Sequence, residues 1–67
     1  MELIIKVGDL AVLQNLHEDW GKMALITALP PPEWGYGQIV LVPSGWTSTA
    51  TIPWTRRHHY IKKVIKG

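Results

Sequence analysis

The side chains best suited to metal binding and proton transfer near neutral pH are three histidines, His17, His58 and His59, and the chain has no cysteine. His58 and His59 are adjacent, so their rings project in different directions, and a zinc ion would need further ligands from elsewhere. The sequence supplies no obvious set of such ligands. We therefore expect no metal site and no cofactor.

Nucleophilic and general acid–base catalysis also lack a matching set of residues. Ser44 lies between Pro43 and Gly45 in a predicted turn, with no evident base to activate its hydroxyl. No catalytic carboxylate pair or Ser-x-x-Lys spacing accompanies the histidines. We therefore expect a protein that is not an enzyme and that takes no small-molecule substrate.

A basic cluster near the C-terminus has the composition of a phosphate-binding surface. Residues 34–67 carry five basic residues and no acid, a charge of +5, whereas residues 1–33 carry five acids and two lysines, a charge of −3. Basic side chains around an aromatic ring can hold phosphates and stack a base. The same distribution also fits a solvated surface turn or head-to-tail association of identical chains. The candidate nucleic-acid contacts are Arg56, Arg57, Lys62 and Lys63.

A second candidate site is the stretch from Pro30 to Gly37, where stiff prolines and flexible glycines surround two aromatic residues. Such loops commonly carry function. Trp34 is flanked by loop residues rather than strand residues, which makes it the best candidate for an interface anchor, with Tyr36 beside it. Three apolar residues on the outer sides of neighbouring predicted strands extend this predicted protein interface: Met23, Leu25 and Val40.

Alternation of apolar and polar residues dominates the chain, and five prolines and six glycines fall between the apolar runs. This pattern is typical of short strands in a small all-β domain. We predict a single domain over residues 1–67, with about five strands and a short 3-10 turn, capped by Thr55, before the last strand. The predicted strands are residues 9–14, Lys22–Leu29, Gln38–Val42, Trp46–Trp54 and Tyr60–Ile65.

The side-chain period of two assigns the faces of these strands. In the first strand we place Leu10 and Val12 inside, and Ala11 and Leu13 on the other face. The second and third strands are apolar on both faces, so the outer face requires another protein surface or a covering loop. The full predicted core is Leu10, Val12, Ile26, Ile39, Leu41, Ile52 and Val64.

Three smaller features complete the predicted fold. Leu3–Val7 either extends the first strand or pairs with a neighbouring chain. Val42–Gly45 suits a type I turn, with Pro at the second and Gly at the fourth position. A bulge or a strand end is expected at the two lysines that Ile61 and Val64 straddle.

The order of Gly8-Asp9-Leu10, Trp20-Gly21, Pro43-Ser44-Gly45 and the closing run Tyr60–Ile65 resembles the small SH3-like barrel proteins encoded by tailed bacteriophages. The resemblance covers nearly the whole chain. It implies a five-stranded SH3-like β-barrel and a minor virion protein, such as a capsid decoration or connector–tail protein, found in the virion or the host cytoplasm. Gly8-Asp9 and Gly21-Lys22 also resemble KOW-type modules of ribosomal and transcription proteins.

Two functions fit these patterns. The first is a non-enzymatic protein–protein interaction module of an assembly, most directly a phage particle, with other assembly proteins or copies of itself as partners. The alternative is a nucleic-acid-binding accessory module that uses the basic C-terminal half. We expect neither a signal peptide nor a transmembrane helix, since Glu2, Lys6 and Asp9 interrupt the N-terminal apolar run. The lack of cysteine suits a reducing compartment.

Overall fold

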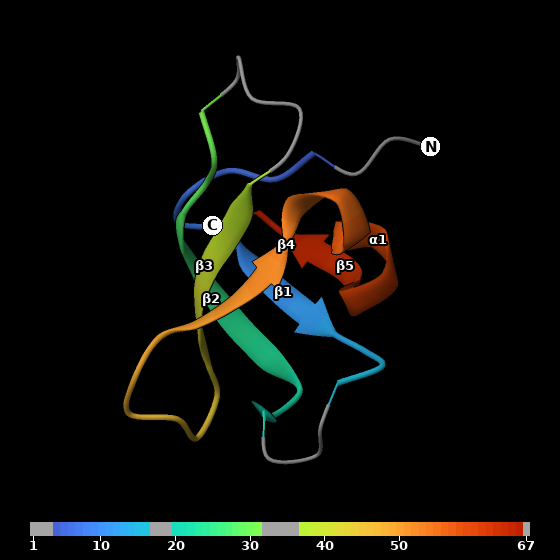
Figure 1. The fold of residues 1–67 in the computed structure, drawn as a ribbon. Helices are drawn as coiled ribbons and strands as arrows, with labels where there is room; N and C mark the ends of the chain where they lie inside the picture. Colours follow the sequence, from blue (N-terminus) through green and yellow to red (C-terminus); the bar gives the residue numbers. More distant parts are fainter. Residues whose placement is uncertain (1–3, 17–19, 32–36, 67) are drawn as a thin grey trace.

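The computed structural model describes residues 4–16, 20–31 and 37–66. They form five antiparallel strands in one sheet with the order β4-β3-β2-β1-β5 (Figure 1). A 3-10 helix and a four-residue helix precede the last strand, which confirms the predicted all-β fold with a short helical turn at this place. The elements are β1 (Leu10–Leu13), β2 (Met23–Ala28), β3 (Gln38–Pro43), β4 (Ala50–Pro53), the 3-10 helix Trp54–Arg56, α1 (Arg57–Tyr60) and β5 (Ile61–Ile65).

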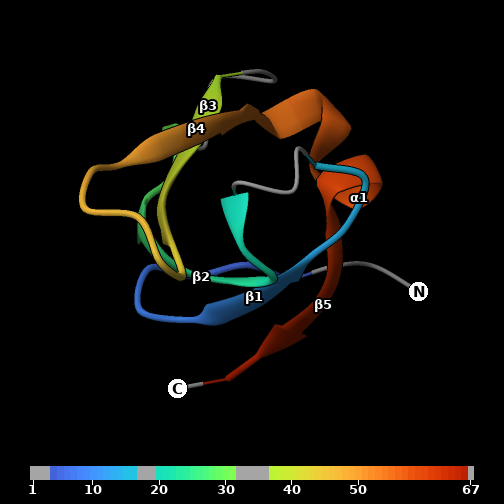
Figure 2. The same cartoon turned by 90° about the horizontal axis from the view of Figure 1, so that it is seen from below.

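The sheet curls around its own apolar side, and the helical turn lies between β4 and β5 (Figure 2). β5 pairs with β1, and within the described ranges no pairing joins β5 to β4. The two strands are therefore the edges of the sheet, connected by the 3-10 helix and α1. β4 is shorter than the predicted strand Trp46–Trp54, because the chain after β3 first forms a turn and bends before it rejoins the sheet.

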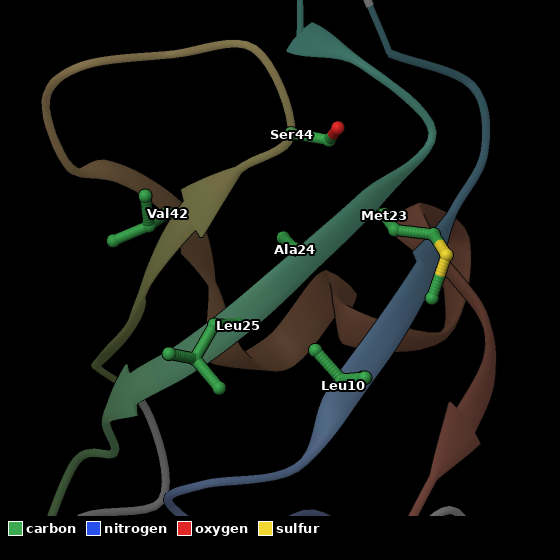
Figure 3. Close-up of a pocket in the computed structure, with 6 residues that line it drawn as sticks. All are labelled: Leu10, Met23, Ala24, Leu25, Val42 and Ser44. Carbon is green, nitrogen blue, oxygen red and sulfur yellow. The ribbon is translucent and has the colours of Figure 1, made fainter.

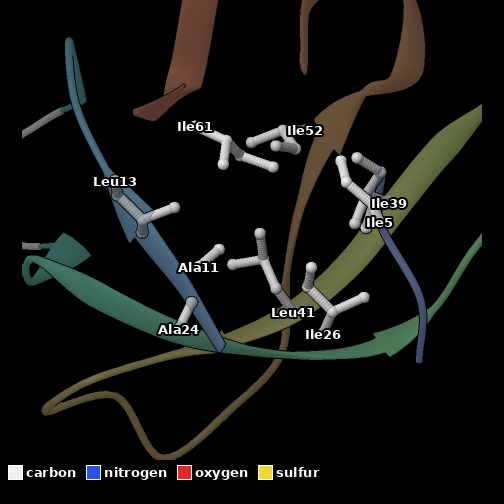
Figure 4. Close-up of a cluster of buried hydrophobic side chains, with 9 residues drawn as sticks. All are labelled: Ile5, Ala11, Leu13, Ala24, Ile26, Ile39, Leu41, Ile52 and Ile61. Carbon is white, nitrogen blue, oxygen red and sulfur yellow. The ribbon is translucent and has the colours of Figure 1, made fainter. Parts of the chain in front are cut away.

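The core is made of aliphatic side chains that point toward one another from the strands and from the segment before β1 (Figure 4). The period of two is regular in β3 and in β2 as far as Ile26, after which a register shift leaves Ala28 exposed. The predicted core positions Ile26, Ile39, Leu41 and Ile52 are buried as expected. Val64 is half-buried and packs against this cluster. The buried members are Ile5, Ala11, Leu13, Ala24, Ile26, Ile39, Leu41, Ile52 and Ile61.

The predicted orientation of β1 is wrong. Ala11 and Leu13 are buried, whereas Leu10 is 37% exposed and Val12 is half-buried. The strand register explains which side of β1 is buried, because Ala11 lies opposite Ala24, which is buried on the inner side of β2. Residues that face each other across an antiparallel pair share a side of the sheet. Leu10 and Val12 therefore belong to the outer side.

The predicted irregularity at the two lysines of β5 is confirmed. Val12 lies opposite Lys63 and Leu13 lies opposite Ile61, so Lys62 is an extra residue in the ladder. A bulge of this kind changes which side of the sheet the following residues face. As a result Ile61 enters the core although it lies three residues from the inward-facing position 64.

The segment before β1 is not a strand in residues 4–7, so it does not extend β1. The alternative, pairing with a neighbouring chain, stays a prediction. The segment turns back at Lys6–Asp9, where the Asp9 N–H donates to the Lys6 carbonyl at 3.1 Å and the Lys6 N–H donates to Asp9 Oδ2 at 3.0 Å. Ile5 is thereby brought into the core. The turn therefore lets the apolar side chain of Ile5 pack in the core of its own chain.

Two predicted local details also differ. The turn after β3 is Pro43–Trp46, closed by the Trp46 N–H on the Pro43 carbonyl at 3.1 Å. Gly45 stands third with φ 86°, the positive value that a type II turn requires and a type I turn does not have. The 3-10 helix begins after Pro53 without a side-chain cap, so Thr55 lies inside it and does not cap it.

Candidate protein interface

The solvent side of β3, β2, β1 and β5 carries large apolar side chains, and we call it the outer face. The register places Leu25 opposite both Val42 and Leu10, and Leu10 opposite Ile65. These four aliphatic residues form one row across four strands. Leu25 is 43% exposed, Ile65 39% and Leu10 37%. An antiparallel sheet that meets water on one side normally has polar residues there, so this row is unusual.

A second row runs beside the first. Met23, 36% exposed, lies opposite Val12, which in turn lies opposite Lys63. The apolar part of the outer face therefore ends at β5 with a lysine. The two rows are adjacent because their members are two residues apart along each strand. The outer face consists of Leu10, Val12, Met23, Leu25, Val42, Ile65 and Lys63.

Part of the outer face is a shallow hollow of about 310 Å³ between β1, β2 and the end of β3 (Figure 3). The side chains of Leu10, Met23 and Leu25 surround it, and Ser44 contributes its one polar side chain. Apolar hollows of this size can accept a side chain from a binding partner. The residues that line it are Leu10, Met23, Ala24, Leu25, Val42 and Ser44.

The rim of the hollow at Ser44 is fixed by close backbone contacts. The Ser44 N–H donates to the Met23 carbonyl at 2.6 Å. Gly21, at φ 78°, lies so near the Ser44 carbonyl that an added Cβ would overlap it. The rings of Trp20 and Trp46 meet beside this point, with centroids 5.6 Å apart. Position 21 therefore requires glycine for both its conformation and its packing.

No protein-family model, curated protein or solved structure matches this chain. No helix in the described ranges is long and apolar enough to cross a membrane.

The residues predicted for the protein interface are partly brought together. Met23 and Leu25 lie exposed on the outer face. Val40 is half-buried on the same side of β3 as Val42, but it lies opposite Ala28 and does not line the hollow. Trp34 and Tyr36 lie outside the described residues, so their predicted role as anchors stays a prediction.

Sequence reasoning missed Leu10 and Ile65 as parts of this surface. All four residues of Leu10–Leu13 are apolar, so alternation gives no signal for the side on which each lies. Ile65 did have a signal, because it stands two residues after Lys63 and a strand places such residues on one face. The meeting of Leu10 and Ile65 across the sheet is visible only in the register.

The basic residues predicted to contact nucleic acid do not form one free surface. The Arg57 guanidinium lies over the Trp54 ring at 4.3 Å from its centroid, and its Nη1 donates to the Trp54 carbonyl at 2.8 Å. Such a cation–π contact with a hydrogen bond holds the helical turn together. Arg56, Lys62 and Lys63 are exposed.

The two described histidines stabilise the helical turn through hydrogen bonds to their backbone carbonyls. The His58 and His59 carbonyls accept hydrogen bonds from Gln14 Nε2 at 3.3 Å and Asn15 Nδ2 at 2.9 Å. Both side chains are exposed, and His17 lies outside the described residues. Among the residues that the structure describes, no group of three or more His, Cys, Asp or Glu side chains could hold a metal ion.

Proposed function

We propose that this protein is a non-enzymatic protein-binding module that docks its outer face on another protein. The observation that carries this proposal is the aliphatic row Val42–Leu25–Leu10–Ile65 across four strands. Exposed apolar area is favourable to bury, at about 25 cal/mol per Å². A contiguous patch of this kind on a small domain marks an interaction surface.

The hollow beside the row adds shape to this surface. It is bounded by Leu10, Met23 and Leu25, and the Ser44 rim is fixed by the hydrogen bond to β2. A rigid backbone around an apolar depression lowers the entropy that is lost when a partner docks. The hollow supports docking of one apolar side chain of the partner as an anchor.

The resemblance to phage-encoded SH3-like proteins supports a partner among the proteins of a phage particle. The five-stranded sheet with a 3-10 helix before β5 is compatible with that resemblance. In such an assembly the module would join two components without catalysing a reaction. Trp34 and the Pro30–Gly37 loop remain the second predicted anchor of this assembly contact.

The test compares two double variants that each replace two exposed aliphatic side chains by serine. Leu10→Ser with Leu25→Ser alters the outer face, whereas Ile4→Ser with Val7→Ser removes exposed aliphatics from the segment before β1, where both are 60% exposed. Fragments that bind the natural protein are first selected from a displayed library of the genome that encodes the chain. Their affinities for both variants are then measured by calorimetry.

We expect the outer-face variant to lose affinity by about 10-fold or more, and the control variant to lose less than about 3-fold. Both variants must keep the circular-dichroism spectrum of the natural protein. Equal binding of the selected fragments to the two variants would show that the outer face is not the docking surface.

A further inference from the structure

β1 divides its backbone hydrogen bonds between its two neighbours, residue by residue. The Leu13 N–H donates to the carbonyl of Lys22, just before β2, at 2.7 Å. The next N–H, that of Gln14, donates to the carbonyl of Tyr60, just before β5, at 2.8 Å. Backbone groups alternate between the two sides of an antiparallel strand. The even-numbered residues of β1 therefore bond to β5.

This alternation identifies the backbone groups at the outer edge of β5. Lys63 and Ile65 lie opposite the even-numbered residues Val12 and Leu10, so their backbone groups turn toward β1. Val64 lies between them, and its N–H and C=O therefore point away from β1. In the described part of the chain the sheet order places no strand on that side. An edge of this kind can accept an extended segment as a further strand.

The side chains at this edge define which segment fits. Both rows of the outer face end on β5, the first at Ile65 and the second at Lys63. A strand added at the edge continues cross-strand rows, with each new side chain opposite its neighbour. It would carry an aliphatic residue opposite Ile65 and an acidic residue opposite Lys63. The two residues would be separated by one position in the segment.

The charge of the edge disfavours the β5 edge of a second copy as the occupant. Lys62 and Lys63 are exposed, and the one acid in the described ranges, Asp9, has a side chain only 8% exposed and bonds Lys66 Nζ at 2.9 Å. Two β5 edges brought together would gather these lysines without a carboxylate between them. Like charges across a strand pair are destabilising, whereas opposite charges stabilise it. The edge is therefore suited to an acidic strand of another protein.

We propose that the partner adds an extended segment to β5 as a sixth, antiparallel strand, bonded to the Val64 backbone, with an aliphatic residue opposite Ile65 and an acidic residue opposite Lys63. This inference rests on the proposed function, because it names the chemistry of the segment that the outer face would meet. The aliphatic residue extends the apolar row, and the acidic residue sets register and orientation. Every other strand pair of the sheet is also antiparallel.

The probe is a capped hexapeptide, threonine-isoleucine-threonine-glutamate-glutamate-threonine, whose isoleucine and first glutamate would lie opposite Ile65 and Lys63. Amide hydrogen exchange by NMR is measured on the full chain, alone and with the peptide. In the free protein we expect the Val64 amide to exchange faster than those of Lys63 and Ile65. Saturating peptide should then slow the Val64 amide by about 10-fold or more.

Charge is tested with a matched peptide in which both glutamates are lysines. The natural protein should bind it at least about 10-fold more weakly, and Lys63→Glu should reverse that preference. Equal binding of both peptides, or a slow Val64 amide in the free protein, would overturn the proposal. Val64 protection that rises with protein concentration alone would assign the edge to a second copy and overturn it as well.

Two further measurements separate this proposal from its alternatives. A duplex DNA that binds more tightly than the acidic peptide, and that leaves Val64 unprotected, would assign Lys62 and Lys63 to nucleic acid and overturn strand addition. Fragments that require Leu10 and Leu25 but never protect Val64 would also overturn strand addition. In that last case docking on the outer face would still stand, so the two proposals fail separately.

Discussion

At the scale of single residues, Asn15 connects the loop after β1 to the helical turn before β5. It has φ 57°, and its side chain donates to the His59 carbonyl at 2.9 Å, across 44 positions of the chain. The last carbonyls of a helix lack partners within the helix. Asparagine supplies the missing donor and also tolerates the left-handed conformation better than most residues.

Two substitutions separate these roles of Asn15. Asn15→Gly keeps the left-handed conformation and loses the hydrogen bond, which should lower the free energy of unfolding by about 1 kcal/mol. Asn15→Ala loses the bond and also strains the backbone, so we expect about 2–3 kcal/mol. Urea denaturation measures both. Equal losses would show that the backbone conformation at position 15 contributes nothing.

At the scale of elements, β1 decides how the molecule is divided between core and surface. Its inner side chains Ala11 and Leu13 pack in the core, and its outer side chain Leu10 lies at the centre of the aliphatic row. A strand has only these two sides, and a shift by one residue exchanges them completely. The position of β1 between β2 and β5 therefore creates the outer face and the core together.

The orientation of β1 is tested by truncating one residue from each side. Leu13 is 8% exposed, so Leu13→Ala should cost about 2–5 kcal/mol of unfolding free energy, enough to unfold most of the population. Leu10→Ala should cost about 1 kcal/mol or less, since Leu10 already contacts water. Thermal melts compare the two variants. The opposite order would return Leu10 to the core and remove it from the outer face.

At the scale of the whole molecule, Asp9 joins the two ends of the described chain. Its Oδ2 accepts the Lys6 N–H at 3.0 Å and the Lys66 ammonium at 2.9 Å. Lys66 Nζ also donates to the Ile4 carbonyl at 2.9 Å. A buried carboxylate is stable only with such partners. These contacts hold the segment before β1 in place, so that Ile5 packs in the core although it does not belong to a strand.

A double-mutant cycle measures this connection. Lys66→Met in the natural protein removes the Lys66 cation from the buried Asp9 charge, so we expect a loss of about 1–3 kcal/mol. The same change in an Asp9→Asn background should cost less by about 1 kcal/mol, because no charge remains to be neutralised. Urea denaturation at constant salt supplies all four stabilities. Strictly additive losses would mean that the Asp9–Lys66 pair contributes no coupling.

The sequence alone determined the class of fold and much of the core. A period of two broken by Pro and Gly is a local property, and it correctly predicted an all-β sheet, the buried residues of β2 and β3, and the exposure of Met23 and Leu25. The two adjacent lysines of β5 also correctly predicted the bulge in that strand. At the strand ends and at the bulge, polar and apolar positions, or turn residues and strand residues, differ within a few neighbours.

Tertiary structure decided which side of an evenly apolar strand is buried and which distant residues meet. Leu10–Leu13 is apolar throughout, so only its pairing with β2 and β5 fixed which side is buried. Arg57, a candidate phosphate contact of the alternative function, stacks on Trp54, a contact set by the path of the helical turn. The aliphatic row depends on register between residues up to 55 positions apart, from Leu10 to Ile65. Side chains so distant in sequence become neighbours only when the sheet has formed, which is why the continuous row across four strands appears in the structure alone.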